Sequence, residues 1–164
     1  MTSFRTGSGI DVHRFADAPV ANGTVILGGV AIAHEYPLLA HSDGDVMTHA
    51  LIDAILGALA LGDIGTHFPD SDPAYAGISS LALLERVNGM MVEAGWALGN
   101  ADITVVAQAP KIAPHAAAIR ERLAQTLAVT TDRISVKATT SEGLGFTGRG
   151  EGIAVFASVL LVGN

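Results

Sequence analysis

The sequence contains no cysteine, which excludes disulfides, thiolate zinc sites and cysteine nucleophiles. Charged residues are also scarce: they make up 15 % of the 164 residues, whereas about a quarter is usual. So few charges on so small a protein indicate that part of its surface does not face water. We therefore expect a homo-oligomer, and the alternative is a compact monomer with an unusually apolar surface.

Basic residues are few, and Lys111 and Lys137 are the only lysines. Nine Lys and Arg against sixteen Asp and Glu give a formal net charge of −7. Because nucleic-acid binders usually present a basic face, we expect no nucleic-acid partner. For an anionic substrate, metal ions would have to supply much of the local positive charge.

Long apolar runs are missing as well. No stretch reaches the length of a membrane span, and residues 1–5 lead into glycine and serine, not into the apolar segment of a signal peptide. We therefore expect a cytoplasmic protein with no membrane partner. The length predicts a single domain over residues 1–164.

The densest group of ionisable side chains lies in residues 41–49, which contain two histidines, two aspartates and Ser42 ahead of an apolar, alanine-rich stretch. Such groups are poor core material unless they are paired or bound to a metal. Asp43 or Asp45 is a suitable cap for a helix that begins near Asp45. His49 would then lie near the start of this helix, either in a chemical site or as a core histidine with a hydrogen-bond partner.

Residues 10–15 alternate with period two, which places Asp11 and His13 on the same face of a predicted strand. Together with His49 they offer one carboxylate and two imidazoles, the donor set of a zinc site with an open fourth position. Sequence spacing alone does not bring these residues together, and an exposed polar strand face is the alternative.

The remaining pattern predicts an α+β fold. Helical or alternating periodicity predicts helices at 45–59, 79–94 and 115–127, and strands at 24–32, 101–107, 134–138 and 153–162. The order β-β-α-α-β-α-β-β predicts a single layer of mixed β-sheet with helices packed on one face. Asn22-Gly23 predicts a hairpin turn into the second strand, and Gly28-Gly29 predicts a bulge or second turn.

Three polar loops are further candidates for the site. Residues 63–73 hold carboxylates that suit a cation or ribose hydroxyls, although ordinary turn chemistry explains them equally well. Residues 108–114 form a loop at a strand end, where functional groups are common. Residues 139–152 combine hydroxyls, glycines and Glu142, which suit phosphate oxygens and a hard cation that bridges them.

Six segments, in order, closely resemble the 2-C-methyl-D-erythritol 2,4-cyclodiphosphate synthase family. They are residues 9–13, 41–46 with His49, 62–65, 68–70, 107–111, and 137–140 with 146–151. The resemblance implies a phosphorus–oxygen lyase of the non-mevalonate isoprenoid pathway. Such an enzyme cyclises 4-diphosphocytidyl-2-C-methyl-D-erythritol 2-phosphate to 2-C-methyl-D-erythritol 2,4-cyclodiphosphate and releases CMP. It also implies a homotrimer with active sites between neighbouring subunits.

The resemblance further implies roles for individual residues. Asp11, His13 and His49 correspond to zinc ligands, and Glu142 to a ligand of a second divalent ion, Mg²⁺ or Mn²⁺, shared with substrate phosphates. His41 and Thr140 correspond to catalytic residues that stabilise the transition state or hold the phosphates. Substrate contacts are implied for Ser42, Asp63, Ile64, Gly65, Phe68, Pro69, Asp70, Ser71, Asp72, Ala107, Gln108, Ala109, Pro110, Lys111, Ile112, Ala113, Thr139, Ser141, Phe146 and Arg149.

The family also has a central apolar channel, in which some members hold an isoprenoid diphosphate. Phe146, Arg149 and Glu151 resemble the residues that line it. The sequence departs from the family at three places. Ser141 stands where many members have Thr, Gly143 where Lys is common, and Ile10 where some members have a channel Phe.

Two other functions fit the same residues. A metal-dependent phosphoesterase would use the Asp/His site and water to hydrolyse simple phosphate esters. An oligomeric metal- or isoprenoid-binding protein would show ligand binding without turnover.

Overall fold

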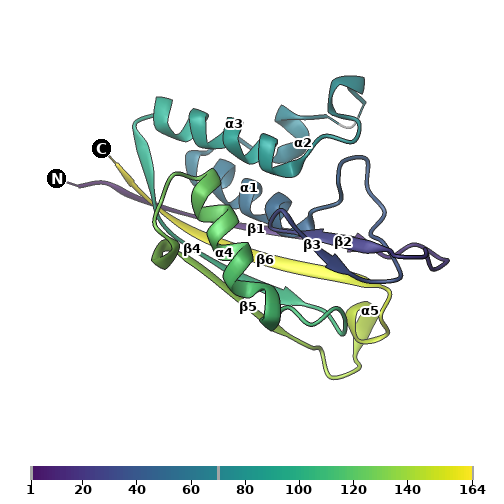
Figure 1. Cartoon of the computed structure of the whole chain (residues 1–164). Helices are drawn as coiled ribbons and strands as arrows, with labels where there is room; N and C mark the ends of the chain where they lie inside the picture. Colours follow the sequence, from purple (N-terminus) through teal and green to yellow (C-terminus); the bar gives the residue numbers. More distant parts are fainter. Residues whose placement is uncertain (1, 70, 164) are drawn as a thin grey trace.

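The structure is a computed structural model that describes residues 2–69 and 71–163 (Figure 1). Four strands form a mixed sheet in the order β1-β6-β4-β5. They are β1 (Phe4–Arg14), β6 (Gly152–Gly163), β4 (Trp96–Val106) and β5 (Ile134–Thr139). Strand β6 is antiparallel to β1 and β4, whereas β4 and β5 are parallel. Strands β1 and β5 are therefore the two edges of the sheet.

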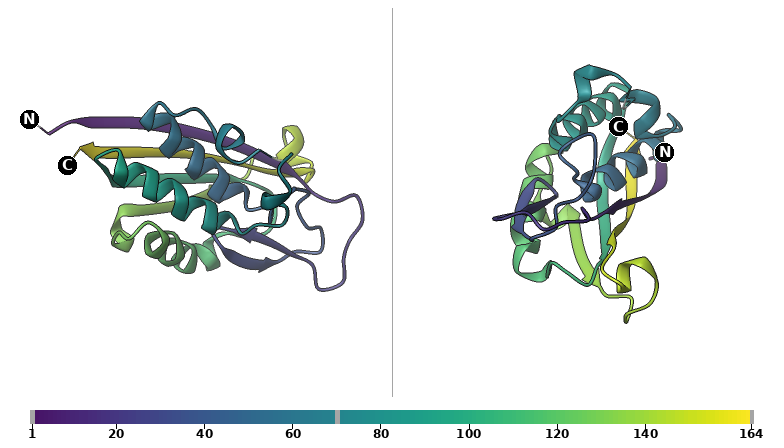
Figure 2. Two further views of the ribbon diagram at one scale, coloured as in Figure 1. Left: turned by 90° about the horizontal axis from the view of Figure 1, so that it is seen from above. Right: turned by 90° about the vertical axis from the view of Figure 1, so that its right-hand side faces the viewer.

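Three long helices cover one face of this sheet: α1 (Val46–Leu59), α3 (Ser80–Glu93) and α4 (Ala116–Thr126) (Figures 1 and 2). Their apolar sides join the inward side chains of the sheet in one hydrophobic core. The predicted mixed sheet with helices on one face is therefore confirmed. None of the helices in the described part of the chain is both long and apolar enough to cross a membrane.

Residues 24–32 are not one continuous strand, and of the two alternatives predicted for Gly28-Gly29 the second turn is confirmed. This segment forms two strands, β2 (Thr24–Leu27) and β3 (Val30–Ala33), which pair as a separate two-stranded sheet. Gly28 and Gly29 form the turn, with φ of +56° and +73°. A two-residue hairpin of this kind needs positive φ at both positions, which glycine adopts readily. The hairpin is β2–β3, so Asn22-Gly23 does not turn the chain back onto β1.

Short elements also differ from the predicted order. Helices α2 (Ile64–His67) and α5 (Gly145–Gly148) lie in predicted loops, and the 3₁₀ turns η1 (Pro73–Tyr75) and η2 (Ala113–His115) begin in predicted loops. A further turn, η3 (Thr131–Arg133), precedes β5. Strand β4 begins at Trp96 and not at Ala101, because residues 96–98 already pair with the end of β6 across a bulge near Gly99. The predicted element order is thus incomplete.

Helix α1 lies directly against β1 because two glycines of β1 face it. A Cβ atom at Gly9 would lie 2.0 Å from the carbonyl oxygen of Ala50, and one at Gly7 would lie 2.0 Å from that of Ala54. Any side chain would therefore push the helix away. This close approach brings His49, the residue before Ala50, next to Asp11 on β1.

The opposite face of the sheet carries large exposed apolar side chains. Phe4, Ile10 and Val12 on β1 and Phe156 on β6 are 45–62 % exposed in the single chain. Ile10 is paired in register with Phe156, so the exposed apolar surface crosses both strands. An apolar surface of this kind is typical of a protein–protein interface.

Candidate metal centre and adjoining cleft

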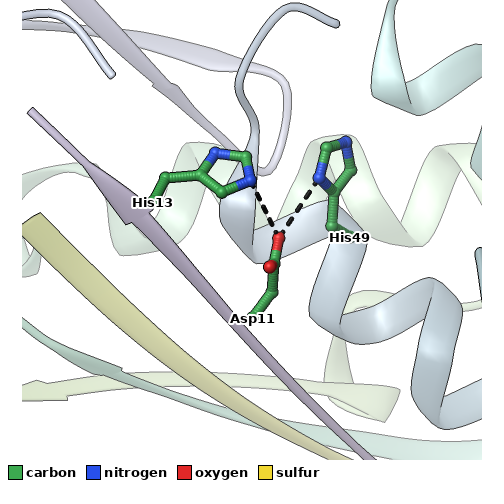
Figure 3. A group of neighbouring side chains, drawn as sticks. All are labelled: Asp11, His13 and His49. Carbon is green, nitrogen blue, oxygen red and sulfur yellow. Dashed lines mark hydrogen bonds and ion pairs between the residues drawn. The ribbon is translucent and has the colours of Figure 1, made fainter. Parts of the chain in front are cut away.

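The two ligands predicted on β1 and the one predicted on α1 meet in space. His13 Nε2 lies 3.1 Å and His49 Nδ1 lies 3.2 Å from Oδ2 of Asp11 (Figure 3). One ligand atom from each residue lies within 4.8 Å of the others. Within residues 2–69 and 71–163, no other group of three His, Cys, Asp or Glu side chains has this geometry.

The outer nitrogen of each histidine is hydrogen-bonded. His13 Nδ1 lies 3.1 Å from the carbonyl oxygen of Gly44. Because a peptide carbonyl only accepts hydrogen bonds, Nδ1 carries the proton, and Nε2 keeps a lone pair toward Asp11. His49 Nε2 lies 2.8 Å from Ser80 Oγ and 3.2 Å from Ser42 Oγ. Such partners of the outer nitrogen are typical of histidines that bind a metal.

The charges of the cluster favour a cation. Burial by itself raises the pKa of Asp11, but the hydrogen bonds to His13 and His49 outweigh it and hold the pKa well below its ordinary value. Burial lowers the pKa of His13, but its contact with the Asp11 carboxylate outweighs this and raises the pKa. An ionised carboxylate therefore faces two imidazole nitrogens. This donor set fits a zinc ion, although the identity of the metal remains a prediction.

The start of α1 is held by Asp45, which is fully buried. Its carboxylate accepts hydrogen bonds from the backbone N–H groups of Gly28 at 2.9 Å, Gly29 at 2.7 Å and Thr48 at 3.0 Å, and from the Thr48 hydroxyl at 2.7 Å. Burial raises the pKa of Asp45, while these hydrogen bonds act in the opposite direction. The predicted cap at Asp45 is confirmed. It joins the β2–β3 turn to the helix that carries His49.

A cleft of about 340 Å³ opens beside the cluster. Besides Asp11, His13 and His49, its walls include the predicted site residues His41, Ser42, Ile64, Gly65 and Phe68. The backbone N–H of Ile64 donates to Asp53 Oδ1 at 2.7 Å, which ties α2 to α1 one turn after His49. The structure thus brings eight predicted site residues to one cleft.

The other site residues predicted within residues 63–73 lie on segments that adjoin the cleft. Asp63 caps α2 and accepts from the backbone N–H of Thr66 at 2.9 Å. Asp72 caps η1 in the same way, and Pro69 and Ser71 lie between these two turns. Asp70 lies outside the described residues.

Most of the remaining predicted site residues lie at or after the ends of β4 and β5, on the other side of the sheet. Thr139 is the last residue of edge strand β5 and residues 140–142 follow it. Residues 107–113 follow the inner strand β4, whereas the cleft lies at edge strand β1. Three strand spacings separate β1 from β5, a distance of about 14 Å. Within one chain, the structure therefore does not bring Thr139, Thr140, Ser141 or Glu142 into the cleft.

This second group has its own local contacts. Gln108 Nε2 donates to the carbonyl oxygen of Gly148 at 3.4 Å, and Ser141 Oγ donates to that of Leu144 at 2.6 Å. Thr140 Oγ1 accepts from the backbone N–H of Glu142, whose own side chain is exposed. These contacts link the predicted residues after β4 and β5 to α5.

Phe146 lies at a second hollow, of about 480 Å³, which Val12, Arg14 and Glu151 also line. Arg149 forms a two-bond ion pair with Glu151, at 2.7 and 3.1 Å. This hollow lies between the start of β6 and the end of β1, beside the exposed apolar face of the sheet.

The sequence pattern does not reveal Ser80, whose hydroxyl contacts His49, or the cleft-wall residues Tyr75, Ile78 and Leu83. The helix predicted over residues 79–94 carries no predicted site residue. A serine at a helix start is usually read as a cap, so its sequence position gave no sign of a contact with residue 49.

Comparisons with known proteins agree with this geometry. The YgbB family model matches residues 4–162. The 2-C-methyl-D-erythritol 2,4-cyclodiphosphate synthase of Xanthomonas axonopodis pv. citri (strain 306) is 58 % identical over 159 residues, which are 97 % of this chain and 93 % of that protein. The chain belongs to this synthase family. The synthase of Alcanivorax borkumensis is 59 % identical over 161 residues, 98 % of each chain.

Solved structures support the same assignment. The bifunctional IspDF of Campylobacter jejuni superposes with a TM-score of 0.92 at 45 % identity, over 100 % of this chain and 43 % of that one. IspF of Plasmodium falciparum, solved as a CDP complex, superposes with a TM-score of 0.86 at 36 % identity, over 99 % and 97 % of the two chains. The resemblance inferred from the six sequence segments is confirmed. As a cyclodiphosphate synthase, the protein is an enzyme of isoprenoid biosynthesis.

Proposed function

We propose that this family member cyclises 4-diphosphocytidyl-2-C-methyl-D-erythritol 2-phosphate to 2-C-methyl-D-erythritol 2,4-cyclodiphosphate in the non-mevalonate pathway. The 2-phosphate attacks the β-phosphorus of the cytidine diphosphate arm, the bond from that phosphorus to the CMP oxygen breaks, and CMP leaves. The enzyme is then a phosphorus–oxygen lyase. The observation that carries the proposal is the Asp11, His13 and His49 cluster beside a cleft with His41 and Ser42, in a chain 58 % identical to a synthase.

Two divalent ions are part of the proposal. Asp11, His13 and His49 would hold Zn²⁺, and Glu142 with the substrate phosphates would hold Mg²⁺ or Mn²⁺. When bound, these ions supply positive charge and Lewis acidity to the phosphates. The protein itself has a net charge of −7 and few cationic side chains, which supports a metal as the source of that charge.

The chain's own residues would bind and orient the two reacting phosphates. In an intramolecular transfer, this positioning accounts for much of the rate enhancement. His41, in the cleft wall, and Thr140, after β5, would hold phosphate oxygens as negative charge shifts between them. Ser42 lies between His41 and the start of α1, where its hydroxyl would contact the substrate.

The rest of the substrate would lie along the polar loops. Asp63, Ile64, Gly65, Phe68, Pro69, Asp70, Ser71 and Asp72 would contact the ribose and erythritol portions. The loop formed by Ala107, Gln108, Ala109, Pro110, Lys111, Ile112 and Ala113 would bind the cytosine base through its backbone groups. Thr139 and Ser141 would complete the phosphate side. The CDP complex of the Plasmodium falciparum protein supports a cytidine nucleotide as part of the ligand here.

We further propose that the chain, one domain over residues 1–164, acts as a cytoplasmic homotrimer with active sites between subunits. Two observations support this assembly. The Glu142 group follows the sheet edge opposite the cleft, so in the proposed site a neighbouring chain would supply it. The exposed apolar face with Phe4, Ile10 and Phe156 would be covered in the trimer. Phe146, Arg149 and Glu151 would then line a central channel that suits an isoprenoid diphosphate.

CMP release from the cytidine substrate, measured with and without a metal chelator, tests this function. We expect release by the untreated enzyme, loss of release after chelation, and recovery when Zn²⁺ and Mg²⁺ are returned. A simple phosphate ester should not be hydrolysed. If the enzyme hydrolyses such esters but does not cyclise the cytidine substrate with release of CMP, the metal-dependent phosphoesterase is favoured instead.

A further inference from the structure

Ser80 and Asp43 form a hydrogen-bonded pair behind His49, on the side away from Asp11. We propose that they are positioning residues that fix which nitrogen of His49 carries the proton, so that Nδ1 keeps its lone pair for the metal. The inference rests on the proposed metal centre and deepens it. It assigns a task to two residues that are not metal ligands.

The Asp43 carboxylate sets the direction of the hydrogen bonds that lead to His49. Ser80 is fully buried in the first turn of α3, and both its polar groups donate to this carboxylate. Ser80 Oγ lies 2.5 Å from Asp43 Oδ1, and Ser80 N lies 2.9 Å from Asp43 Oδ2. A serine hydroxyl has one proton, and here it points to the carboxylate. The Ser80 oxygen therefore presents only lone pairs to other neighbours.

His49 is the neighbour that those lone pairs face. Its Nε2 lies 2.8 Å from Ser80 Oγ, so Nε2–H donates to Ser80. The contact from Nε2 to Ser42 Oγ is longer, at 3.2 Å. A neutral imidazole protonated at Nε2 has a free lone pair at Nδ1, and Nδ1 is the nitrogen that points to Asp11 (Figure 3).

The pair acts against a competing interaction on the other side of the ring. Asp11 Oδ2, 3.2 Å from Nδ1, favours a proton on Nδ1, and that tautomer would block metal binding. The acceptor provided by Ser80 and Asp43 favours the opposite tautomer. The carbonyl of Gly44 has the same effect on His13. Residues 43 and 44 together therefore prepare both histidines for the metal.

The substitution Asp43→Asn should reverse this chain of hydrogen bonds. The Asn oxygen can still accept from Ser80 N, but its NH₂ group then meets Ser80 Oγ and donates to it. The Ser80 proton is released toward His49 Nε2, which becomes an acceptor. The ring then carries its proton on Nδ1. Because Asn has nearly the same shape as Asp, the substitution changes the direction of these hydrogen bonds while it leaves the side-chain packing almost unchanged.

The test measures the His49 tautomer and the Zn²⁺ affinity of the purified full chain. Nitrogen-15 NMR of the metal-free protein, at a pH where the ring is neutral, reports the protonated nitrogen. We expect Nε2–H in the wild type and Nδ1–H in Asp43→Asn and Ser80→Ala. Competition with a chelator should give Zn²⁺ binding about 10- to 100-fold weaker in both variants.

Ser79→Ala and Asp132→Asn are the matched controls, because both side chains are exposed and Ser79 caps α3 without a side-chain hydrogen bond. Both should keep wild-type tautomer and affinity. Thermal unfolding checks that the variants are folded. If Ser80→Ala does not fold, the result for Asp43→Asn decides whether the inference holds. Unchanged tautomer and Zn²⁺ affinity in a folded Asp43→Asn would overturn the inference, even with active wild-type enzyme. If the wild type binds no Zn²⁺ but Asp43→Asn still changes the His49 tautomer, only the proposed metal centre is overturned.

Discussion

His49 Nδ1 and Asp11 Oδ2 lie 3.2 Å apart, although a hairpin and a long loop separate the two residues in sequence. The contact depends on the glycines of β1, which let the backbone of α1 lie directly on the strand. It also depends on Asp45, which fixes the first turn of the helix. The candidate metal centre is therefore a product of how α1 packs on β1.

Removal of a ligand should remove the metal. We expect purified wild-type protein to hold about one tightly bound Zn²⁺ per chain, and His13→Ala to lose it. Glu142→Ala should keep this ion, because Glu142 follows the opposite edge strand. Metal analysis of the three proteins measures the outcome. Full zinc content in His13→Ala would show that the ligand assignment is wrong.

Zinc binding should weaken in acid. The pKa of His13 is raised above its ordinary value, so in the metal-free protein a proton occupies the ligand nitrogen up to a higher pH. As the pH falls from about 8 to about 6, we expect the affinity to fall by about tenfold per pH unit for each proton displaced. Chelator competition at several pH values measures this slope. His115→Ala, outside the cluster, should leave it unchanged, and a flat profile would contradict the proposed ligand set.

A side chain at Gly9 should separate α1 from β1. The added Cβ of Gly9→Ala would lie 2.0 Å from the Ala50 carbonyl oxygen, which is part of a helix backbone and has little room to move. We expect a loss of about 1–3 kcal/mol of unfolding free energy, measured by denaturant titration, together with weaker Zn²⁺ binding.

Gly89→Ala is the control for this substitution, because a Cβ at Gly89 on α3 meets no atom within 4 Å. It should leave Zn²⁺ binding intact and raise stability by up to about 1 kcal/mol through helix propensity. Equal stabilities of the two variants would argue against the close approach of α1 and β1.

Loss of the Asp45 carboxylate should destabilise the start of α1. In Asp45→Ala the backbone N–H groups of Gly28, Gly29 and Thr48 lose their acceptor in a buried place. We expect the free energy of unfolding to fall by about 2–4 kcal/mol, since each unsatisfied buried donor costs about 1–3 kcal/mol and water can reach some of them. Thermal and urea unfolding test this. The exposed Asp132→Ala should unfold like the wild type, and equal stability of Asp45→Ala would refute the role given to its carboxylate.

Mixed subunits test the proposed sharing of active sites. His41→Ala disables the cleft side and Glu142→Gln disables the opposite edge, so each variant alone should be nearly inactive. After the two are unfolded and refolded together in equal amounts, about a quarter of the sites should combine two intact halves and restore that share of activity. Each variant refolded alone is the control. If mixed trimers form but activity does not recover, both halves of the site belong to one chain.

Much of the fold could be predicted from local patterns. Alternation in residues 10–15 placed Asp11 and His13 on one face, and the acidic cap at Asp45 marked the start of α1. The β2–β3 turn was less clear, because Gly28-Gly29 suits both a bulge and a hairpin turn. The position of the hairpin off the main sheet depends on β1 pairing with β6, which is a long-range choice.

The site was predictable only in part, for a similar reason. Three ligands could be named from residue chemistry and family resemblance, but their distances follow from the contact of α1 with Gly7 and Gly9. The role of Ser80 depends on how α3 lies over the start of α1. Periodicity within one helix does not encode that contact.

In the proposed reaction one phosphate of the substrate attacks another, without water. The most direct measurement is the mass of the product formed from the cytidine substrate in ¹⁸O-labelled water. Intramolecular cyclisation predicts a cyclic diphosphate and CMP that both lack solvent ¹⁸O. A linear product carrying one ¹⁸O atom would show hydrolysis and contradict the proposed cyclisation.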